Sequence, residues 1–521
     1  MNTAEFLLIT SAVVPDREAL VGEKDRITFA GMTERVNRLA NALAARGVSR
    51  GTAVAVMATN SPQFIETYYA VAKLGGALVP LNYRAKREEI NYMITNSESA
   101  YLFASERYLD LCRELGELPG LRETFVYDAK VDDLPTYDAL LAAGSPDELF
   151  TEIDENDATI LIYTSGTTAM PKGVVLSYHD FTTYVVNTME PASPEEPHDV
   201  TLLSVPLYHI AGATTMASAV FGGRTLVVPP QFDPANWLSL VQKEKATHAF
   251  VVPTMLKRII EHDDFGKTDL SSLKLVAYGA APMPYEVVRH AVDVFPPNVG
   301  LMNAYGQTES TSSLTFLGPD DHRIEGSDEE KEKKYQRLRS VGQAMPDVAV
   351  VIMNEEGGIL APNEEGEICA MGERIMKGYH KMEGETSKAI QDGWLHTGDV
   401  GYLDDDGYLF ITGRLKDMII RGGENIASGE VEAVIESHPK VEEAAVIGVE
   451  DVEWGEEVKA IVVLKEGETA TADEIIAYTK ERIASFKAPK YVSFVDELPR
   501  SYVGKVLKTE LRKRYGEPVS A

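Results

Sequence analysis

Cysteine is scarce in this sequence of 521 residues, which contains two, Cys112 and Cys369, far apart along the chain. Their spacing is typical neither of a metal site nor of a disulfide framework, and it fits a reducing compartment. We expect both cysteines to be packing residues and the protein to be cytoplasmic.

Positive charge is also in short supply. Lys and Arg number 50 against 81 Asp and Glu, which gives a formal net charge of -31 at pH 7. A surface field of this sign repels polyanions and therefore disfavours nucleic acid and anionic membranes as partners. A phosphorylated ligand must instead be held locally, by backbone N–H groups, a few placed cations and Mg²⁺.

Long apolar runs are missing as well. The apolar stretch from Phe6 to Val14 is short, has no basic segment before it and is followed at once by Pro15-Asp16. Such a run is typical of a packed helix, so we expect neither a targeting segment nor a membrane span. With 44% hydrophobic and 25% charged residues, the composition is that of a globular protein.

Two common nucleotide-binding fingerprints are absent. A P-loop requires Gly-x4-Gly-Lys-Ser/Thr, but at the Gly-Lys-Thr of residues 266–268 Glu261 stands where the first glycine belongs. No complete Gly-x-Gly-x-x-Gly opens a helix either, so hydride transfer on a Rossmann domain has no support.

The sequence does show a regular alternation of strand-like and helix-like segments. Strand-like runs at 27–29 and 53–57 enclose apolar residues at helical spacing. Ser61-Pro62 supplies an N-cap and a first-turn proline for a second helix, which Gly75-Gly76 ends before a strand at 77–80. This alternation predicts a parallel sheet covered by helices.

The pattern changes along the chain, which predicts separate lobes. The alternation returns between 201 and 303, whereas the charged stretch 320–339 is expected to be a surface insertion. Shorter strands and Gly-rich turns then predict a β-rich lobe, and a small α+β unit follows it. We therefore expect an α/β fold with a large N-terminal domain of stacked sheets (1–415, β-rich lobe about 341–415) and a small C-terminal domain (416–521).

A segment rich in small hydroxyl residues follows the apolar run 158–162. Residues 163–173 read Tyr-Thr-Ser-Gly-Thr-Thr-Ala-Met-Pro-Lys-Gly. Backbone N–H groups and hydroxyls here can converge on phosphate oxygens, and a lysine adds charge. A Ser/Thr-rich surface turn is the alternative, but eleven residues in this order favour a phosphate loop. Its candidate ligands are Thr164, Ser165, Gly166, Thr167, Thr168 and Lys172.

Together with further motifs, this loop makes the chain resemble the adenylate-forming superfamily of acyl-CoA synthetases, firefly-type luciferases and peptide-synthetase adenylation domains. The resemblance runs from about residue 20 to 515 and is nearest to AMP-forming fatty or aromatic acid CoA ligases. The further motifs are Pro206-Leu207-Tyr208-His209, Tyr278-Gly279-Ala280-Ala281-Pro282, residues 304–309 (Ala-Tyr-Gly-Gln-Thr-Glu), 393–399 (Gly-Trp-Leu-His-Thr-Gly-Asp), 413–417 (Gly-Arg-Leu-Lys-Asp) and Gly504-Lys505.

The resemblance implies an ATP site. In the family, the residue at Tyr305 stacks on adenine, the hydroxyl at Thr308 contacts the α-phosphate and the carboxylate at Glu309 holds Mg²⁺. Asp399 would accept both ribose hydroxyls, and Arg414 would add a ribose or phosphate contact. The other implied ATP- or AMP-binding residues are Gly279, Ala280, Ala281, Pro282 and Gly306.

Lys505 matches the family lysine that contacts both the substrate carboxylate and the α-phosphate. A carboxylate that attacks an anionic phosphorus needs a cation between the two charges, so Lys505 is implied as catalytic together with Thr308 and Glu309. Two departures from the family pattern occur: Ala169 stands where glycine is common, and Tyr502-Val503 replaces smaller or polar residues.

The resemblance also implies a mobile C-terminal domain. It would rotate about a hinge at Lys416, so that Lys505 leaves the site after adenylation and residues 422–424 approach it. The implied coenzyme A channel consists of Gly422, Gly423 and Glu424.

The implied activity has two steps: a carboxylic acid and Mg·ATP give acyl-AMP and pyrophosphate, and coenzyme A then takes the acyl group. No Asp or Glu appears in the stretch directly after Pro206 to hold an α-amino group, which favours an apolar acid, aliphatic or aromatic. The expected acyl pocket contains His209, Ala213, Val251, Tyr278, Gly279, Met302 and Asn303.

The sequence leaves three alternative functions open. The acceptor could be a carrier-protein phosphopantetheine instead of coenzyme A, although no carrier domain follows residue 521. A luciferase-like oxygenase is less favoured because no separate oxidation motif is present. A non-catalytic nucleotide-binding scaffold is less favoured because Lys505, Glu309 and the phosphate loop are all intact. A homodimer is compatible with the sequence.

Overall fold

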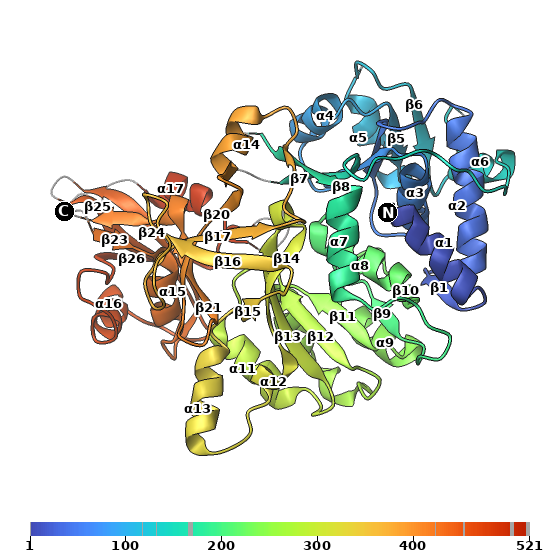
Figure 1. Ribbon diagram of the computed structural model, residues 1–521. Coiled ribbons are helices and arrows are strands. Elements are labelled where there is room, and N and C mark those ends of the chain that lie inside the picture. Colours follow the sequence, from blue (N-terminus) through green and yellow to red (C-terminus); the bar gives the residue numbers. More distant parts are fainter. Residues whose placement is uncertain are drawn as a thin grey trace.

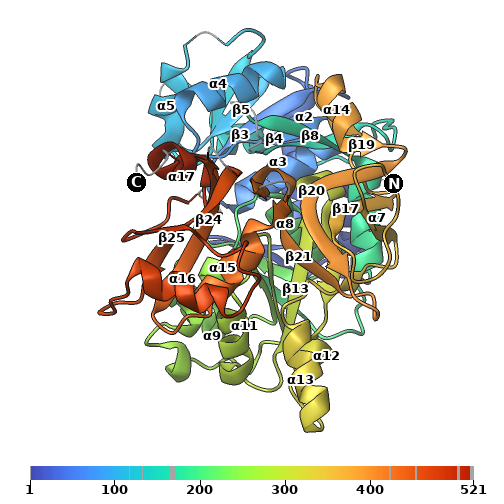
Figure 2. The ribbon, with the colours of Figure 1, turned by 90° about the vertical axis from the view of Figure 1, so that its left-hand side faces the viewer.

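The computed structural model describes residues 2–116, 118–131, 133–164, 170–421, 424–451, 454–500 and 505–516. Its strands form four sheets, and helices fill the spaces between and around them (Figure 1). The C-terminal part of the chain lies at one side of the larger N-terminal part and faces the viewer in Figure 2. The predicted fold class is confirmed.

A mostly parallel sheet of seven strands is built from the first third of the chain. Alternate residues of its strands face different cores: Val54 and Val56 enter one, and Ala55 and Met57 enter another. Because the strands are buried on both faces, the run 53–57 is continuously apolar. The order is β18 (Gly378–Tyr379), β8 (Lys172–Ser177), β7 (Ala158–Thr164), β4 (Ala77–Pro80), β3 (Ala53–Met57), β5 (Tyr101–Ala104) and β6 (Glu123–Val126).

A second sheet of nine strands lies beyond a layer of helices. Alternate residues of its strands again face different cores, since Leu226 faces that helix layer and Val227 faces away from it. The order is β15 (Gln343–Ala344), β14 (Ser312–Leu317), β13 (Gly300–Gln307), β12 (Leu275–Gly279), β11 (His248–Val251), β9 (Val200–Leu202), β10 (Thr225–Val227), β1 (Glu18–Val21) and β2 (Arg26–Thr28).

The largest hydrophobic core occupies the helix layer between these two sheets. Here the predicted N-cap is confirmed, because Ser61 Oγ accepts from the Phe64 N–H at 3.1 Å and Pro62 opens the helix. The helices of this core are α1 (Thr3–Val13), α2 (Phe29–Ala44), α3 (Pro62–Lys73), α7 (Tyr178–Thr188) and α8 (Ile210–Phe221), and α6 (Tyr137–Ala143) packs on α2.

Two further groups of helices cover the outer faces of the sheets. α4 (Arg87–Asn96) and α5 (Leu109–Glu114) cover the seven-stranded sheet. The nine-stranded sheet is covered by α9 (Pro234–Glu244), α10 (Pro253–Ile260) and α11 (Tyr285–Val294). The short helix α12 (Pro319–His322) comes directly after β14 in the chain. The stretch expected as a surface insertion contains α13 (Asp328–Arg337), which buries no residue and projects from the molecule in Figure 1.

A third, antiparallel sheet is formed within the segment expected as a β-rich lobe. Two short strands from the same part of the chain belong to other sheets: β15 joins the nine-stranded sheet, and β18 pairs with β8 of the seven-stranded one. The strands are β16 (Val348–Met353), β17 (Gly366–Gly372), β20 (Trp394–Leu403), β19 (Ile390–Gln391) and β21 (Leu409–Arg414), with α14 (Glu383–Ala389) beside them.

The C-terminal part has its own sheet with a core on each face. Val446 packs beneath α15 and α16, whereas Ile447 faces Leu511 of α17. Its elements are β22 (Ile419–Arg421), β23 (Glu424–Ile426), α15 (Ser428–Glu436), β24 (Val441–Asp451), β25 (Gly455–Leu464), α16 (Ala472–Lys480), β26 (Tyr491–Phe494) and α17 (Lys508–Tyr515).

Candidate active site

The predicted site residues follow the carboxyl ends of strands from both large sheets. β7 ends at Thr164, β12 at Gly279 and β13 at Gln307. In open α/β folds, ligands bind at this edge. Ser165, Gly166, Thr167 and Thr168 of the phosphate loop, and Gly422 and Gly423 of the expected channel with the side chain of Glu424, lie outside the described residues.

The segment from Gly279 to Pro282 approaches its neighbouring strand closely. A Cβ added to Gly279 would lie 2.1 Å from the Ala304 carbonyl oxygen, and one on Gly306 would lie 1.9 Å from that of Ser312. Ala280 has φ +67°, a left-handed conformation that costs energy in a residue with a side chain. Backbone atoms therefore form this part of the site, as an adenine ring lying against the chain would require.

A short turn, η3 (Thr308–Ser310), presents Thr308 and Glu309. The Met376 N–H donates to the Glu309 carbonyl oxygen at 2.8 Å, and the Arg374 guanidinium donates to that of Ser310 at 2.9 Å. Arg374 is fully buried and pairs with Asp347 at 2.6 Å. This buried arginine holds the turn from behind, and the motifs gave no sign of it.

Tyr379 connects the phosphate loop to Glu309. Its hydroxyl donates to Glu309 Oε1 at 2.9 Å, and Lys172 Nζ lies 4.8 Å from its ring centroid. Lys172 also pairs with Glu385 at 2.5 Å, and hydrogen bonding from Lys172 lowers the pKa of that carboxyl to about 2. Burial, with Glu309 beside it, raises the pKa of Tyr379, which therefore stays protonated. Tyr379 and Glu385 were not predicted.

Asp399 is held in one orientation by three groups. Tyr305 donates to its Oδ2 at 2.9 Å, Arg414 Nε lies 2.9 Å from its Oδ1, and its own N–H donates to Thr397 Oγ1 at 3.1 Å. Burial, and next to it the Asp399 charge, raises the pKa of Tyr305, so the phenol remains a donor. Tyr305, Asp399 and Arg414, which the sequence places up to 109 residues apart, thus form one cluster.

A second cluster supports the turn before Asp399. One oxygen of Glu367 lies 2.7 Å from His396 Nδ1, and the other accepts from the Gly398 N–H at 3.0 Å. Gly398 has φ +71°, which favours glycine. Cys369 Sγ lies 3.6 Å from the same His396 nitrogen, and burial raises the pKa of this thiol to about 12. Glu, Cys and His are metal-ligand types, but both carboxylate oxygens here already accept hydrogen bonds from the turn.

Lys505 lies within electrostatic reach of Arg414, Asp399 and Glu309, although the residue as a whole is exposed. Desolvation by the surrounding protein atoms, and then the Arg414 charge, lower its pKa to about 8, against the opposing effects of Asp399 and Glu309. Lys416, in η4 (Leu415–Asp417), has a pKa lowered mainly by burial. Two C-terminal lysines therefore lie within electrostatic reach of Asp399.

The side chains expected in the acyl pocket divide between two faces of the nine-stranded sheet. Ala213 packs in the core between the sheets, whereas Val251 and Tyr278 are fully buried on the opposite face, where Tyr278 Oη lies 2.9 Å from His322 Nε2. By the alternation of β-strands, Asn303 shares the opposite face with Leu301. These three side chains therefore lie on the other side of the sheet from Ala213, and the acyl pocket stays a prediction.

Four of the expected pocket residues remain on the face toward α8. Gly279 and Met302 point opposite to Tyr278 and Leu301, because neighbouring residues in a strand alternate. His209 is the N-cap of α8, and Ala213 lies one turn into it. Burial, and then the nearby Lys505 charge, lower the pKa of His209 to about 3, so the imidazole is neutral. These four residues are therefore uncharged, and the charges of Lys505 and Arg84 lie within electrostatic reach of His209.

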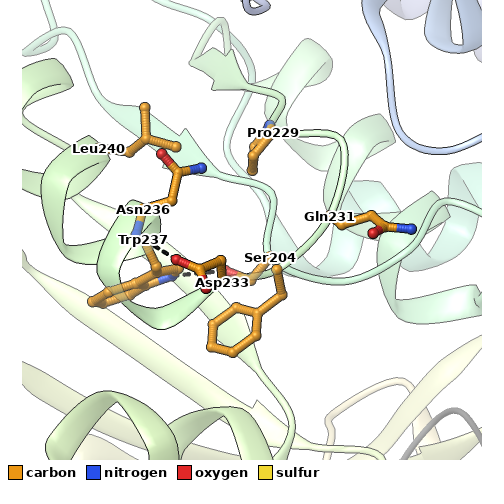
Figure 3. A pocket seen from close by; sticks show the side chains of 8 residues that line it. Ser204, Pro229, Gln231, Asp233, Asn236, Trp237 and Leu240 are labelled. Atoms are coloured by element: carbon orange, nitrogen blue, oxygen red, sulfur yellow. Dashed lines mark hydrogen bonds between the residues drawn. The ribbon is translucent and has the colours of Figure 1, made fainter. Parts of the chain in front are cut away.

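A separate recess lies after the carboxyl ends of β9 and β10 (Figure 3). Trp237 Nε1 donates to Ser204 Oγ at 2.9 Å within it. Gln231 and Asp233 are among the residues that line it. None of its lining residues belongs to the predicted ATP or acyl sites.

The fold and the convergence of these residues define a nucleotide-dependent α/β enzyme. The AMP-binding enzyme family matches residues 9–380, and the AMP-binding enzyme C-terminal domain matches residues 430–505. The chain belongs to this family of AMP-binding enzymes, so the predicted membership of the adenylate-forming superfamily is confirmed.

Relatives resemble the chain over nearly its whole length. A feruloyl-CoA synthase of Amycolatopsis sp is 35% identical over 94% of both chains, and the long-chain-fatty-acid–CoA ligase FadD13 of Mycobacterium tuberculosis is 33% identical over 95% of this chain and 94% of its own. ATP-bound MatB from Rhodopseudomonas palustris superposes with a TM-score of 0.88 at 30% identity, covering 99% of each chain. The prediction that this chain is an enzyme is confirmed.

No helix among the described residues has both the length and the apolar character needed to cross a bilayer.

Proposed function

We propose that the protein is an AMP-forming acyl-CoA synthetase that activates an apolar carboxylic acid. The observation that carries this proposal is the position of Lys505, whose charge interacts with Arg414, Asp399 and Glu309 at once. A lysine within electrostatic reach of a ribose-type carboxylate and a metal-type carboxylate suits the joining of an acid to the α-phosphate of ATP.

In the first step, the substrate carboxylate attacks the α-phosphorus, the bond to pyrophosphate breaks, and acyl-AMP remains bound. Asp399, fixed by Tyr305 and Arg414, would accept the ribose hydroxyls and orient the nucleotide. Lys172 would exchange its pairing with Glu385 for one with the departing phosphates. Lys505 would offset the repulsion between the carboxylate and the phosphate.

Glu309 fits Mg²⁺ by the chemistry of its donor set. A carboxylate is the hard oxygen ligand that this ion prefers, and the Tyr379 hydroxyl bond to Oε1 fixes the direction of the group. The bound ion would neutralise phosphate charge. The residues of this chain keep Glu309 beside Lys172, where the phosphates are expected.

In the second step, the coenzyme A sulfur attacks the acyl carbon, the bond to AMP breaks, and AMP leaves with the electron pair. We propose that the C-terminal domain, 416–521, rotates about Lys416 between the steps, which removes Lys505 and brings Gly422, Gly423 and Glu424 to the site. β21 ends at Arg414 and Lys416 lies in the short turn η4 that follows, so the chain changes direction at this point. The two free cysteines fit a cytoplasmic enzyme.

An apolar acid is favoured by the side chains beside Lys505. His209 is neutral, and Ala213, Gly279 and Met302 carry no charge, so these four residues offer no counter-charge to a charged substituent. The names of the relatives cover both an aromatic and a long-chain aliphatic acid.

The test is an assay of acid-dependent pyrophosphate exchange into ATP without coenzyme A, over a panel of hydroxycinnamic, arylacetic and C8 to C16 fatty acids. Exchange with at least one apolar acid is expected, followed by thioester formation when coenzyme A is added. If exchange required coenzyme A, acyl-AMP would not be the first product. Loading of a phosphopantetheinyl carrier protein with no reaction of free coenzyme A would instead support the carrier-dependent alternative.

A further inference from the structure

Lys505 directly precedes Val506, and described residues on both sides fix the backbone at this point. Arg500 and Val506 form an isolated antiparallel bridge, and the Leu507 N–H donates to the Pro499 carbonyl oxygen at 2.8 Å. Helix α17 begins one residue later, at Lys508. The placement of Lys505 therefore depends on what holds the start of α17.

Lys508 makes two short polar contacts with helix α15. Its Nζ lies 2.6 Å from Glu432 Oε1 and 2.6 Å from Ser428 Oγ. The Glu432 carboxylate also accepts from the Val446 N–H at 2.7 Å, and the Lys508 side chain is only 14% exposed. A buried, hydrogen-bonded ion pair with a third partner is directional, unlike a surface pair.

Helix α15 in turn packs on the strand that carries Arg414. A Cβ added to Gly429 would lie 2.5 Å from the Thr412 carbonyl oxygen, and one added to Gly413 would lie 3.5 Å from Ala427 Cβ. Helix α17 has a second tie at the hinge, where Arg512 lies 2.9 Å from Asp417 Oδ1. Contacts thus run from Lys508 through α15 to β21, and from Arg512 to the segment next to Lys416.

We propose that Lys508 and Glu432 are positioning residues that set the location of Lys505 in the adenylation step. The proposal rests on the proposed function and adds two residues that do not touch the reacting atoms. If Lys508 is released from Glu432, the start of α17 loses its anchor and the Lys505 ammonium leaves its place within reach of Asp399 and Arg414. Thioester formation does not use Lys505, so it should be insensitive to this loss.

The variants to compare are Lys508→Met, Lys508→Arg and the double variant Lys508→Met/Glu432→Gln. The double variant is included because Lys508→Met alone leaves a buried carboxylate without its cation, which can unfold the domain. Lys513→Met is the matched control, since this lysine lies on the same helix, is 72% exposed and pairs only with Glu510 in the described structure.

Misplacement of a catalytic group by about 1 Å can cost roughly 10²-fold, so the double variant should lose roughly 10-fold to 100-fold in pyrophosphate exchange. Its rate of thioester formation from supplied acyl-AMP should stay within about twofold of wild type. Lys508→Arg should recover most of the exchange rate, because the guanidinium retains the charge and hydrogen bonds. Equal losses in both half-reactions by a folded protein, or unchanged exchange, would refute the positioning role.

A second measurement is independent of activity. Lys505 in the unliganded enzyme is modified with acetic anhydride over a range of pH, and its labelling is quantified by mass spectrometry. The apparent pKa should be about 8 in wild type and Lys513→Met, and it should move toward the ordinary lysine value near 10.4 in the double variant. An unchanged pKa of Lys505 in the double variant would overturn the positioning role. This result does not depend on the proposed function, which would fail separately if no acid supported exchange.

Discussion

Lys505→Ala separates the two half-reactions, and the loss of adenylation rate that it causes depends on pH because the surroundings of Lys505 lower its pKa. Loss of one preorganised charge-stabilising group costs roughly 10²-fold to 10³-fold, or about 2.7–4 kcal/mol. The lowered pKa of Lys505, about 8, comes from burial and then Arg414. The ammonium is the active form, so activity falls as pH rises through this pKa. With that pKa, roughly nine-tenths of the lysine is charged at pH 7 and roughly one-tenth at pH 9.

The ratio of the wild-type to the Lys505→Ala value of kcat/KM for pyrophosphate exchange should therefore fall about tenfold between pH 7 and pH 9. The measurement is kcat/KM for exchange, because this ratio reports the pKa of the free enzyme, with Lys513→Ala as a control that should keep the wild-type profile. Thioester formation from supplied acyl-AMP should be nearly normal in both variants. Damage to both half-reactions by a folded Lys505→Ala protein, or a wild-type to Lys505→Ala ratio that does not change with pH, would refute the reasoning.

Three further residues give testable outcomes. Asp399→Ala should weaken ATP binding in calorimetry by about 1.5–3 kcal/mol, because hydrogen bonds to a charged group are lost; unchanged affinity would remove Asp399 from the site. Tyr379→Phe should raise KM for Mg·ATP roughly 5-fold to 10-fold and spare thioester formation, since the Glu309 carboxylate loses its fixed donor; equal effects on both steps would argue for a purely structural tyrosine. Burial raises the pKa of Glu436 to about 7, so its contribution to stability is present below pH 4.5 and is lost as pH rises through 7. Glu436→Gln should therefore become more stable than wild type toward pH 8, by about 3 kcal/mol at most, in urea titrations at several pH values, and a constant difference across pH would contradict this.

The local elements could be predicted because their signals are local. Ser61-Pro62 begins α3, the apolar run 53–57 is β3, and the strand 77–80 has the expected bounds. Each depends on a cap, a proline or a short apolar run within a few residues. The motif residues Tyr305 and Asp399 were likewise identified by their neighbours in sequence, and the structure brings them within hydrogen-bonding distance.

The supporting residues could not be predicted, because their partners lie far away in sequence. Tyr379 reaches Glu309 only because β18 crosses to pair with β8, and Lys172 meets Glu385 213 residues later. Arg374 looks like any surface arginine in the sequence, yet it is fully buried behind Ser310. No periodicity or spacing reports such contacts.

The faces of the strands in the expected acyl pocket could not be predicted either, because a motif identifies a segment and a strand presents successive side chains to opposite faces. Within Tyr278-Gly279, the tyrosine enters the core near His322 and the glycine points the opposite way. Tyr278 and Asn303 thus face away from Met302.

β15 and β18 lie in the segment of the β-rich lobe but pair with the two large sheets, which limits where the chain can be cut into fragments that fold. A fragment ending near residue 340 would lose the edge strands of both large sheets and expose unpaired backbone N–H and C=O groups on β14 and β8. A fragment starting there would carry two strands with no sheet to join. The chain up to β21 should therefore unfold as one cooperative unit, with a separate thermal transition for the C-terminal sheet and its two cores. Chimeras between relatives should accordingly be joined in the segment after Arg414, and crossovers inside 341–380 should aggregate.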